Sequence, residues 1–573
     1  MLASPAFFFV VYAGWNLFPH AKQIYTTFNA EIIGIKHIWS SVWSGDKANI
    51  TRFAFVGIAM PFACFYLPEI IMREWQKVKE NRAFRQSFKE GRGGSAQWAG
   101  EPTLARFQAG AYINNKKILL GRSLFDDDPH TRVIGIDDDT HMITVGMTGS
   151  GKSTTVLLPN LATYAGSAIV LDPKGELANK TYYCRSNEQN LRWQEIQSPV
   201  SKHLINGRCF VLDPFAETKG LPLNCYNLLS EIDIDSDRVR EMLSAISDGC
   251  VTPEKGDNVH FEELAKHFIE GMIAHVLSWY PKENHNLPFI FDLINGVDAD
   301  LKAADPTKFN DLLYEMLKDD AAGGLPLQIA SKILEMGDRE KGSVLSTVTR
   351  SLKWVSDPAM RKHLVKSDFN FFGLNYRTVY IVLPDGLIKE QMRWLRSLIA
   401  LSLTLVKNSP DKAEIPTLFV MDEFPRLGGK IDIISEGFGI LRGYGIKLWA
   451  FLQDIGQLQK DYPDRWTSML ANSTVQVFGV NDLKTAQWVS DMLGAGTTQI
   501  KDNNKQTREV INPLLTPNEV MAKFGKTENR QFVKTVEGFP MRLERCSYKP
   551  LSMGKHGFQE FEHNALKGCF EDW

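Results

Sequence analysis

Short apolar runs separated by longer amphipathic stretches recur from about residue 141 to residue 480. Several runs are almost continuously apolar, which is typical of strands buried on both faces of a parallel sheet. Strands that alternate with helical stretches predict an α/β fold, with helices covering a parallel sheet. The predicted strands are HMITVG (141–146), SAIVLD (167–172), RCFVLD (208–213), TVYIVLP (378–384), TLFVMDE (417–423), KLWAFLQ (447–453) and VQVFGV (475–480).

A long interval without strand patterns, residues 225–365, separates the third predicted strand from the fourth. Within it, residues 262–280 and 309–322 place their apolar side chains at helical spacing. We therefore expect an all-α domain inserted into one loop of the sheet. The sheet domain would then consist of residues 73–224 and 366–573, and its last part, 516–573, mixes charges of both signs without a low-complexity tract.

The first 72 residues differ from the rest because they contain two long apolar segments. Residues 2–18 carry no charged side chain, and residues 53–72 carry only Glu69. Both lengths lie within the range that crosses a bilayer, so they predict a membrane hairpin with residues 19–52 as a short periplasmic loop. A buried helical hairpin is the alternative. A cleaved signal peptide is disfavoured because no basic residue precedes the first segment.

A cluster of basic residues follows the second apolar segment and predicts the orientation of the hairpin. Positive charge close to a membrane span stays on the cytoplasmic side, so the chain after Met72 is expected in the cytoplasm, anchored to the membrane and its lipids. The basic residues are Arg73, Lys77, Lys79, Arg82, Arg85, Lys89 and Arg92.

Composition adds little about partners. The 573-residue chain has a formal net charge of −2, so the whole chain does not indicate nucleic-acid binding, although a locally basic channel is compatible with that value. Its seven cysteines are scattered and include no CxxC pair, which argues against a disulfide framework or a zinc ribbon and suits a reducing compartment.

Residues 146–153 read GMTGSGKS, a complete phosphate-binding loop between a predicted strand and a predicted helix. Its glycines let consecutive backbone N–H groups and the helix N-terminus face a phosphate chain. Lys152 would reach the β- and γ-phosphates of ATP, and Ser153 would bind Mg²⁺. The residues expected to bind the nucleotide are Gly146, Thr148, Gly149, Ser150, Gly151, Lys152, Ser153 and Thr154.

An acidic pair ends the predicted strand at 417–423, where Asp422 and Glu423 follow four apolar residues. Ligands of open α/β sheets bind at the carboxyl ends of the strands, so both side chains are expected near the loop. Asp422 would bind the magnesium, and Glu423 would orient and deprotonate the attacking water. The alternative is that the pair only ends a strand and caps the following loop.

Two further side chains have candidate roles in hydrolysis. Gln453, at the end of the next strand, can hydrogen-bond the γ-phosphate or the water; otherwise it is an ordinary polar strand end. Arg442 can act as an arginine finger on a neighbouring subunit's γ-phosphate, or it forms a surface salt bridge. Arg350, Arg361 and Arg426 compete with it for the finger role.

The segment 172–176, DPKGE, leaves the second predicted strand beside the phosphate-binding loop. It either contacts the nucleotide or a subunit boundary, or it merely forms a turn.

Together these motifs resemble the type IV secretion coupling proteins, the TraG/TrwB-like membrane ATPases related to FtsK/HerA-type translocases. The resemblance covers nearly the whole chain. It rests on GSAQWA (94–99), GMTGSGKS (146–153), VLDPKGEL (170–177), FVMDEFPRLG (419–428), FLQDIGQL (451–458) and LLTPNEV (514–520).

The resemblance implies a RecA-like P-loop domain with an inserted all-α domain and a two-helix membrane anchor. It implies a homohexamer with ATP and Mg²⁺ at subunit interfaces, in which Lys152, Ser153, Asp422, Glu423 and Gln453 take the roles above and Arg442 is the finger. Expected partners are the inner-membrane components of a type IV secretion system and a relaxosome of DNA and relaxase, effector proteins, or both. The alternatives are an FtsK-like double-stranded DNA translocase without a secretion role, and a membrane receptor whose nucleotide site serves assembly.

Overall fold

The computed structural model describes residues 96–107, 117–123, 133–186, 209–252, 259–297, 306–372, 377–410, 412–501 and 507–547. The chain divides into two compact units, Met1–Ser95 and Ala96–Trp573, and all described residues belong to the second. The predicted membrane hairpin therefore lies outside the described residues. Within the described ranges, no helix is both long enough and apolar enough to span a bilayer.

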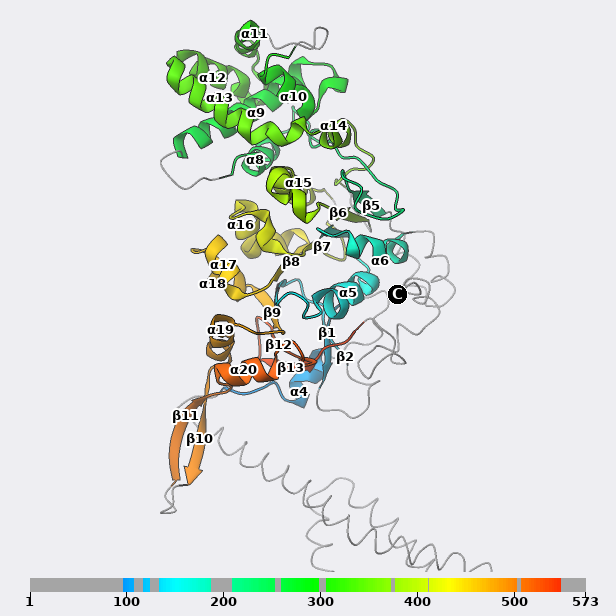
Figure 1. Cartoon of the computed structure of the whole chain (residues 1–573), viewed down its shortest axis with the longest axis vertical. Helices are drawn as coiled ribbons and strands as arrows, with labels where there is room; N and C mark the ends of the chain where they lie inside the picture. Colours follow the sequence, from blue (N-terminus) through cyan, green and yellow to red (C-terminus); the bar gives the residue numbers. More distant parts are fainter. Residues whose placement is uncertain are drawn as a thin grey trace, which may run out of the picture. The chain divides into compact units, whose positions relative to one another are not determined.

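A parallel sheet forms the centre of the second unit (Figure 1). Each of the seven predicted apolar runs overlaps one of its strands, which confirms the prediction of an α/β fold with a parallel sheet. The strands are buried along their whole length, as their near-continuous apolar sequences require. They are β3 (His141–Val145), β4 (Ala168–Leu171), β5 (Cys209–Leu212), β6 (Thr378–Ile381), β7 (Thr417–Met421), β8 (Ile446–Leu452) and β9 (Ser473–Val477).

The strand order within this parallel part is β9-β3-β8-β7-β4-β6-β5. Strand β8 lies between β3 and β7, with Val145 of β3 opposite Leu452 and Met421 of β7 opposite Ala450. The carboxyl ends of these three strands therefore meet at one edge of the sheet. This register brings together segments that are about 300 residues apart in the sequence.

Four antiparallel strands extend the sheet beyond β9, and the sequence patterns did not predict them. The full order is β2-β1-β13-β12-β9-β3-β8-β7-β4-β6-β5, and β12 pairs antiparallel with β9. Charged residues or glycine interrupt the apolar runs of these strands, as in RQFVK of β12 and MRLE of β13. They are β1 (Ile118–Ser123), β2 (Val133–Ile136), β12 (Arg530–Lys534) and β13 (Met541–Glu544). A separate hairpin consists of β10 (Ala495–Lys501) and β11 (Thr507–Pro513).

A buried row of polar side chains links the parallel and antiparallel parts of the sheet. Thr144 donates to Gln476 Oε1 at 3.0 Å, and Gln476 Nε2 donates to Gln531 Oε1 at 2.6 Å. Trp449 Nε1 donates to the Thr144 hydroxyl at 2.9 Å. Because a buried polar group without a partner is costly, these bonds favour one register of β9 and β12 beside β3.

Helices lie on both sides of the sheet and follow its strands in the sequence. Phosphate-loop strand β3 leads into a π-helical turn and then α5. The helices are α4 (Glu101–Leu104), α5 (Leu158–Thr163), α6 (Glu176–Arg185), α15 (Ile388–Lys407), α16 (Asp432–Ile440), α17 (Ile455–Asp461), α18 (Trp466–Ala471), α19 (Leu483–Leu493) and α20 (Pro517–Lys523).

The interval between β5 and β6 is helical in its described parts, in line with its helical spacing. Its longest helix, α9, covers most of the predicted 262–280 segment, whereas the predicted 309–322 segment is helical over 309–316 in α11 and ends at Ala322, which has a left-handed backbone. The helices are α8 (Val239–Cys250), α9 (Val259–Trp279), α10 (Leu287–Ile294), α11 (Pro306–Met316), α12 (Ala321–Glu335), α13 (Asp338–Leu352) and α14 (Pro358–Leu364).

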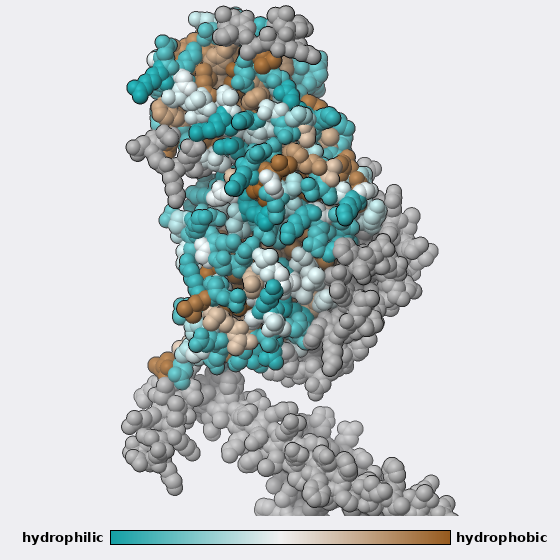
Figure 2. All heavy atoms as spheres, viewed as in Figure 1, coloured by the Kyte–Doolittle hydropathy of each residue, from teal (hydrophilic) through white to brown (hydrophobic). Residues whose placement is uncertain are grey.

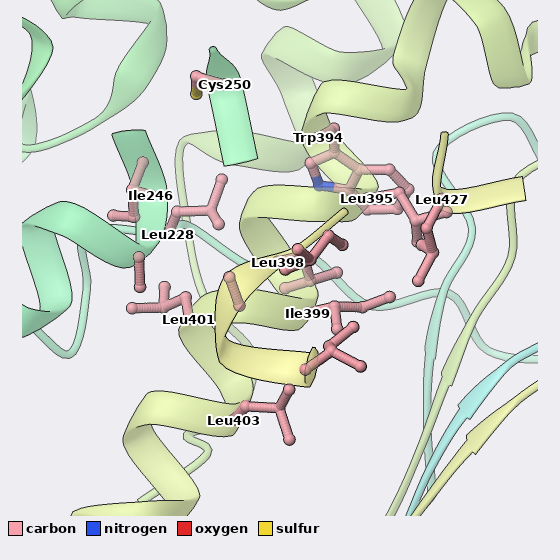
Figure 3. Close-up of a cluster of buried hydrophobic side chains, with 14 of the residues drawn as sticks. Leu228, Ile246, Cys250, Trp394, Leu395, Leu398, Ile399, Leu401, Leu403 and Leu427 are labelled. Atoms are coloured by element: carbon pink, nitrogen blue, oxygen red, sulfur yellow. The ribbon is translucent and has the colours of Figure 1, made fainter. Parts of the chain in front are cut away.

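Helix α15 joins this helical group to the sheet. Its side chains Leu398 and Leu401 are fully buried, and Figure 3 shows Ile246 and Cys250 of α8 beside it. The two helices approach so closely that a Cβ on Gly249 would lie 2.3 Å from the Ser397 Cα atom. Outside this core, Figure 2 shows hydrophilic residues over most of the described part of the visible face.

The close approach of α8 and α15 gives a stability prediction. We expect Gly249→Ala to lower the free energy of unfolding by about 1–3 kcal/mol, because the added methyl group overlaps the backbone of α15. Gly342→Ala is the matched control, since a Cβ at this position of α13 meets nothing within 4 Å. It should instead stabilise by about 0.5–1 kcal/mol. Urea unfolding measures both changes, and equal effects of the two substitutions would contradict the prediction.

Candidate nucleotide-binding site

The loop at residues 146–153 turns sharply at the carboxyl end of β3. Gly149 and Gly151 have φ angles of +71° and +93°, which L side chains rarely adopt. Lys152 is buried, and its ammonium donates to the carbonyl of Gly146 at 2.6 Å, so the side chain folds back over the loop. The predicted loop therefore has the strand before it and the helical turn after it that phosphate binding needs.

The first turn after the loop is wider than an α-helix. Residues Ser153–Leu157 form a π-helical turn, and α5 follows with Pro159 in its first turn. Thr155 donates to the Gly151 carbonyl at 2.8 Å, and Thr154 donates to the same oxygen at 3.2 Å. These hydroxyls add to the Thr155 N–H, which donates to the same carbonyl oxygen at 2.8 Å, and so fix the join between the loop and the helical turn.

The predicted acidic pair follows β7 at the same edge of the sheet. Glu423 has a left-handed backbone, with φ 60° and ψ 47°, an unfavourable conformation for a non-glycine residue that is typical of functional sites. Arg426 Nε donates to Glu423 Oε2 at 3.0 Å, and the guanidinium of Arg426 also pairs with Asp385. The carboxylate of Glu423 is therefore held in one orientation.

Gln453 lies next to this carboxylate, as its place after β8 predicts. Its side-chain Nε2 donates to Glu423 Oε2 at 3.2 Å, while its backbone N–H donates to Gln457 Oε1 at 2.8 Å. Gln453 and Glu423 thus form a direct polar contact between two neighbouring strand ends.

The charges at this edge influence one another. Burial lowers the pKa of Lys152, and the carboxylates of Asp422 and Glu423 oppose that shift. Burial raises the pKa of Asp422 to about 6, with Lys152 opposing the shift and Glu423 adding to it. Lys152 and the acidic pair are therefore within electrostatic reach, which is the arrangement that the sequence analysis predicted.

The segment 172–176 forms a turn and also lies near the site. Asp172 is buried, and its Oδ2 accepts from the Ala178 N–H of α6 at 2.8 Å. Burial raises its pKa to about 7, and Asp422 adds to the shift. The exposed Lys174 influences the pKa values of both Lys152 and Asp422. Its own contact with a nucleotide stays a prediction.

The residues at this edge suit a magnesium nucleotide. Buried next to the loop are two polar atoms without a hydrogen-bond partner among the described residues, Ser150 Oγ and Arg545 Nε. Ser153 and Asp422 offer oxygen ligands, which Mg²⁺ prefers, and Mg²⁺ usually takes only one or two ligands from the protein beside the phosphates. In the described ranges, no group of three or more metal-binding side chains forms a fuller metal cage.

Arg442 lies at the opposite edge of the sheet from Glu423 and Gln453. It is exposed in the 3₁₀ turn Leu441–Tyr444 just before β8 begins, and its side chain has no hydrogen bond or ion pair to a residue in the described ranges. Seven residues of β8 separate the two edges, about 23 Å at 3.3 Å per residue. Arg442 therefore cannot reach the phosphate loop of its own subunit.

The other three candidates for the arginine finger lie elsewhere in the fold. Arg361 pairs with Asp292 in the helical group, and Arg350 lies on α13 of the same group. Arg426 is engaged by Glu423 and Asp385 within its own chain.

Sequence patterns missed two groups of residues around the site. The C-terminal segment contributes Arg545 and Lys526, which lie against the phosphate loop. Buried Arg396 of α15 donates to the carbonyls of Leu427 and Lys430 at 2.8 and 2.7 Å, and so fixes the loop that follows Glu423. No local motif marks these residues, because each acts on a loop that is distant in the sequence.

The fold and the loop sequence define an α/β protein with a P-loop motif at the carboxyl end of a parallel strand. The family described as Type IV secretory system Conjugative DNA transfer matches residues 103–548. Because this match covers most of the chain, the chain belongs to that family, which confirms the resemblance drawn from the motifs.

The names of curated relatives agree with this family. The chain is 28% identical over 556 residues to the conjugal transfer protein TraG of Escherichia coli, covering 89% of this chain and 81% of the relative. It is 24% identical over 430 residues to the type IV secretion system-coupling protein VirD4 of Bartonella quintana, covering 71% of this chain. In that second comparison the chain spans 63% of the relative's length.

Solved structures share the fold. The bacterial conjugative coupling protein TrwBdeltaN70 matches with a TM-score of 0.56 and 15% identity, covering 81% of this chain and 98% of that chain. TrwB in complex with ADP and Mg²⁺ matches with a TM-score of 0.54 and 15% identity, covering 80% of this chain and 97% of that chain.

The raised pKa of Asp172 gives a prediction on stability. Its ordinary pKa is 3.8 and its folded value is about 7, so between these values the folded state keeps a proton that the unfolded state releases. The free energy of unfolding therefore falls as the pH rises through this window, by up to ~1.4 kcal/mol per pH unit. Asp172→Asn keeps an acceptor for Ala178 and should remove this contribution.

Urea midpoints between about pH 5 and pH 8 measure the effect. As the pH rises, the stability of the variant relative to the wild type should increase. Parallel pH profiles for the two proteins would contradict the prediction.

Proposed function

We propose that the chain is an ATP-hydrolysing coupling protein that drives transfer into a type IV secretion or conjugation channel. Family membership supports the coupling role. The observation that carries the hydrolytic activity is the placement of Lys152, Asp422, Glu423 and Gln453 at one edge of the sheet. TrwB structures in complex with an ATP analogue and with ADP and Mg²⁺ support the choice of ligand.

Each residue at this edge has a proposed task. The N–H groups of residues 146–153 and the Lys152 ammonium bind the phosphates and stabilise the charge that develops on them. Ser153 and Asp422 hold the magnesium ion, which supplies Lewis-acid neutralisation of the phosphate oxygens when bound.

Glu423 is the proposed base for the attacking water. A carboxylate that accepts hydrogen bonds from Arg426 and Gln453 is less available as a base, since both donors stabilise its charged form. We infer that Gln453 turns from Glu423 toward the water or the γ-phosphate when hydrolysis occurs. The same amide would then link the phosphate state to the loop between β8 and α17.

A ring of subunits explains the position of Arg442. An exposed arginine about 23 Å from its own site can complete the site of a neighbour, as arginine fingers do. We therefore propose a homohexamer in which Arg442 stabilises the transition state in trans.

Family membership also supports proposed roles for the parts of the chain outside the sheet domain. We propose that residues 1–72 anchor the protein in the bacterial inner membrane, and that residues 225–365 form an all-α domain that faces the cytoplasm. This domain would receive a DNA–relaxase complex, effector proteins, or both, and pass them to inner-membrane components of the secretion system. The family match favours this function over that of a chromosome-type DNA translocase.

Loss of the loop lysine tests the hydrolytic assignment. Lys152→Ala should lower ATP turnover by roughly 100-fold or more, since it removes the main charge that faces the phosphates. Binding of DNA by the full-length chain should remain. Lys341→Ala, on α13 of the helical group, is the control and should leave turnover unchanged. Unchanged turnover in Lys152→Ala would rule out this site as the ATPase centre.

The trans role of Arg442 is tested by complementation. Arg442→Ala and Lys152→Ala rings should each be inactive alone. Equal co-expression creates sites that combine an intact Lys152 with an intact Arg442 from the neighbour, so about a quarter of wild-type turnover should return. In the control, Lys152→Ala is co-expressed with Arg361→Ala, a variant that should retain turnover on its own. An absence of recovery in mixed rings would mean that Arg442 does not act in trans.

A further inference from the structure

Arg545, directly after β13, reaches the phosphate loop from the C-terminal segment. Its guanidinium donates to the carbonyl of Ser150, and its Nη2 also donates to the carbonyl of Glu528 at 2.6 Å. The guanidinium lies 4.8 Å from the centre of the Phe478 ring. The side chain is only 6% exposed, so almost the whole cation is removed from water.

This buried cation has no carboxylate partner among the described residues. Its described acceptors are carbonyl oxygens, and its Nε lacks a hydrogen bond within the same residues. Burial alone lowers its pKa to about 10, with no acid opposing the shift. Burying an arginine in this way is costly unless a negative charge compensates it. The phosphate loop, whose Ser150 carbonyl Arg545 contacts, is expected to bind such a charge.

The hydrogen bond to Ser150 also controls the direction of an N–H group. In a trans peptide the C=O and the N–H point in opposite directions. When Arg545 holds the Ser150 carbonyl outward, the Gly151 N–H must therefore point to the other side of the loop. Gly151 has a φ of +93°, and glycine permits other orientations of this peptide. The arginine thus selects one of them.

Arg545 lies on the side of β3 away from Glu423, the proposed base. Glu423 and Gln453 approach through β7 and β8, whereas Phe478 follows β9 and Arg545 follows β13 on the other side. Lys526 is close as well, since a Cβ on Gly149 would be 3.2 Å from its Nζ. The two cations therefore border the part of the loop that is far from the water-activating residues.

We propose that Arg545 is a positioning residue of the nucleotide site, which holds the Ser150–Gly151 peptide so that the Gly151 N–H faces the phosphates. The bound phosphates in turn supply the negative charge that stabilises the buried guanidinium. Nucleotide occupancy is thereby coupled to the packing of β13 and the C-terminal segment on the loop. This inference rests on the proposed nucleotide site. It adds Arg545 to that site, on the side of the loop away from Glu423.

The test uses the full-length chain with ADP and Mg²⁺ as the probe. In the wild type, ADP should slow hydrogen exchange of the backbone amides of residues 541–545. Arg545→Gln keeps a donor but loses the charge, so ADP affinity should fall about tenfold and this protection should be absent even at saturating ADP. Arg545→Lys keeps the charge and should recover part of the ADP affinity and part of the protection.

Arg542→Gln is the matched control. Arg542 is on β13, the strand that Arg545 follows, and its guanidinium lies over the Trp98 ring at 5.8 Å. This variant should keep both the affinity and the protection. A purely structural role of Arg545 predicts lower stability without nucleotide but unchanged protection once ADP is saturating, and that result would overturn the inference. Unchanged exchange of 541–545 in ADP-loaded wild type would overturn it too.

The two proposals fail in different ways. If the wild type does not bind ADP, or if Lys152→Ala binds it as well as the wild type does, the proposed nucleotide site is wrong. If the wild type binds ADP normally and Arg545→Gln matches it in affinity and protection, only the coupling through Arg545 is wrong.

Discussion

The site depends on one buried positive charge at the carboxyl edge of the sheet. The Lys152 ammonium folds back on the Gly146 carbonyl within electrostatic reach of Asp422 and Glu423, while Asp172 is buried within reach of Asp422. Without the lysine these carboxyl groups would repel one another in a poorly solvated space. Burial raises the pKa values of both Asp172 and Asp422, and Lys152 opposes the shift at Asp422. A magnesium ion would fit this excess of negative charge.

The sheet holds these charges in place because its strands are joined by side chains as well as by backbone. The row from Trp449 through Thr144 and Gln476 to Gln531 crosses from β8 to β12. It connects the strands that carry the phosphate loop to those of the C-terminal segment. Arg396 acts similarly on the other side, since it ties α15 to the loop after Glu423. The helical group packs on α15 through α8. Arg396 of α15 therefore links this group to the loop after Glu423.

Much of the fold was predictable because buried parallel strands have continuous apolar sequences. All seven parallel strands, from β3 to β9, follow from this pattern, and so does the helical interval between β5 and β6. The four antiparallel strands were missed because charged residues or glycine interrupt their apolar runs, as in RQFVK of β12 and MRLE of β13. Their strand character is decided by the partner edge that β9 offers, and local propensity is weak evidence for such strands.

The sequence by itself determined the phosphate loop, the acidic pair and Gln453, because each is a local motif at the end of a strand. It also placed them together, since parallel strands end at one edge. Only the tertiary structure decided that Arg442 lies at the far edge, that Arg426 and Gln453 engage Glu423, and that Arg545 reaches Ser150. These contacts join residues that are up to 395 positions apart. No local pattern encodes them, because they depend on the strand order and on which loops it brings into contact.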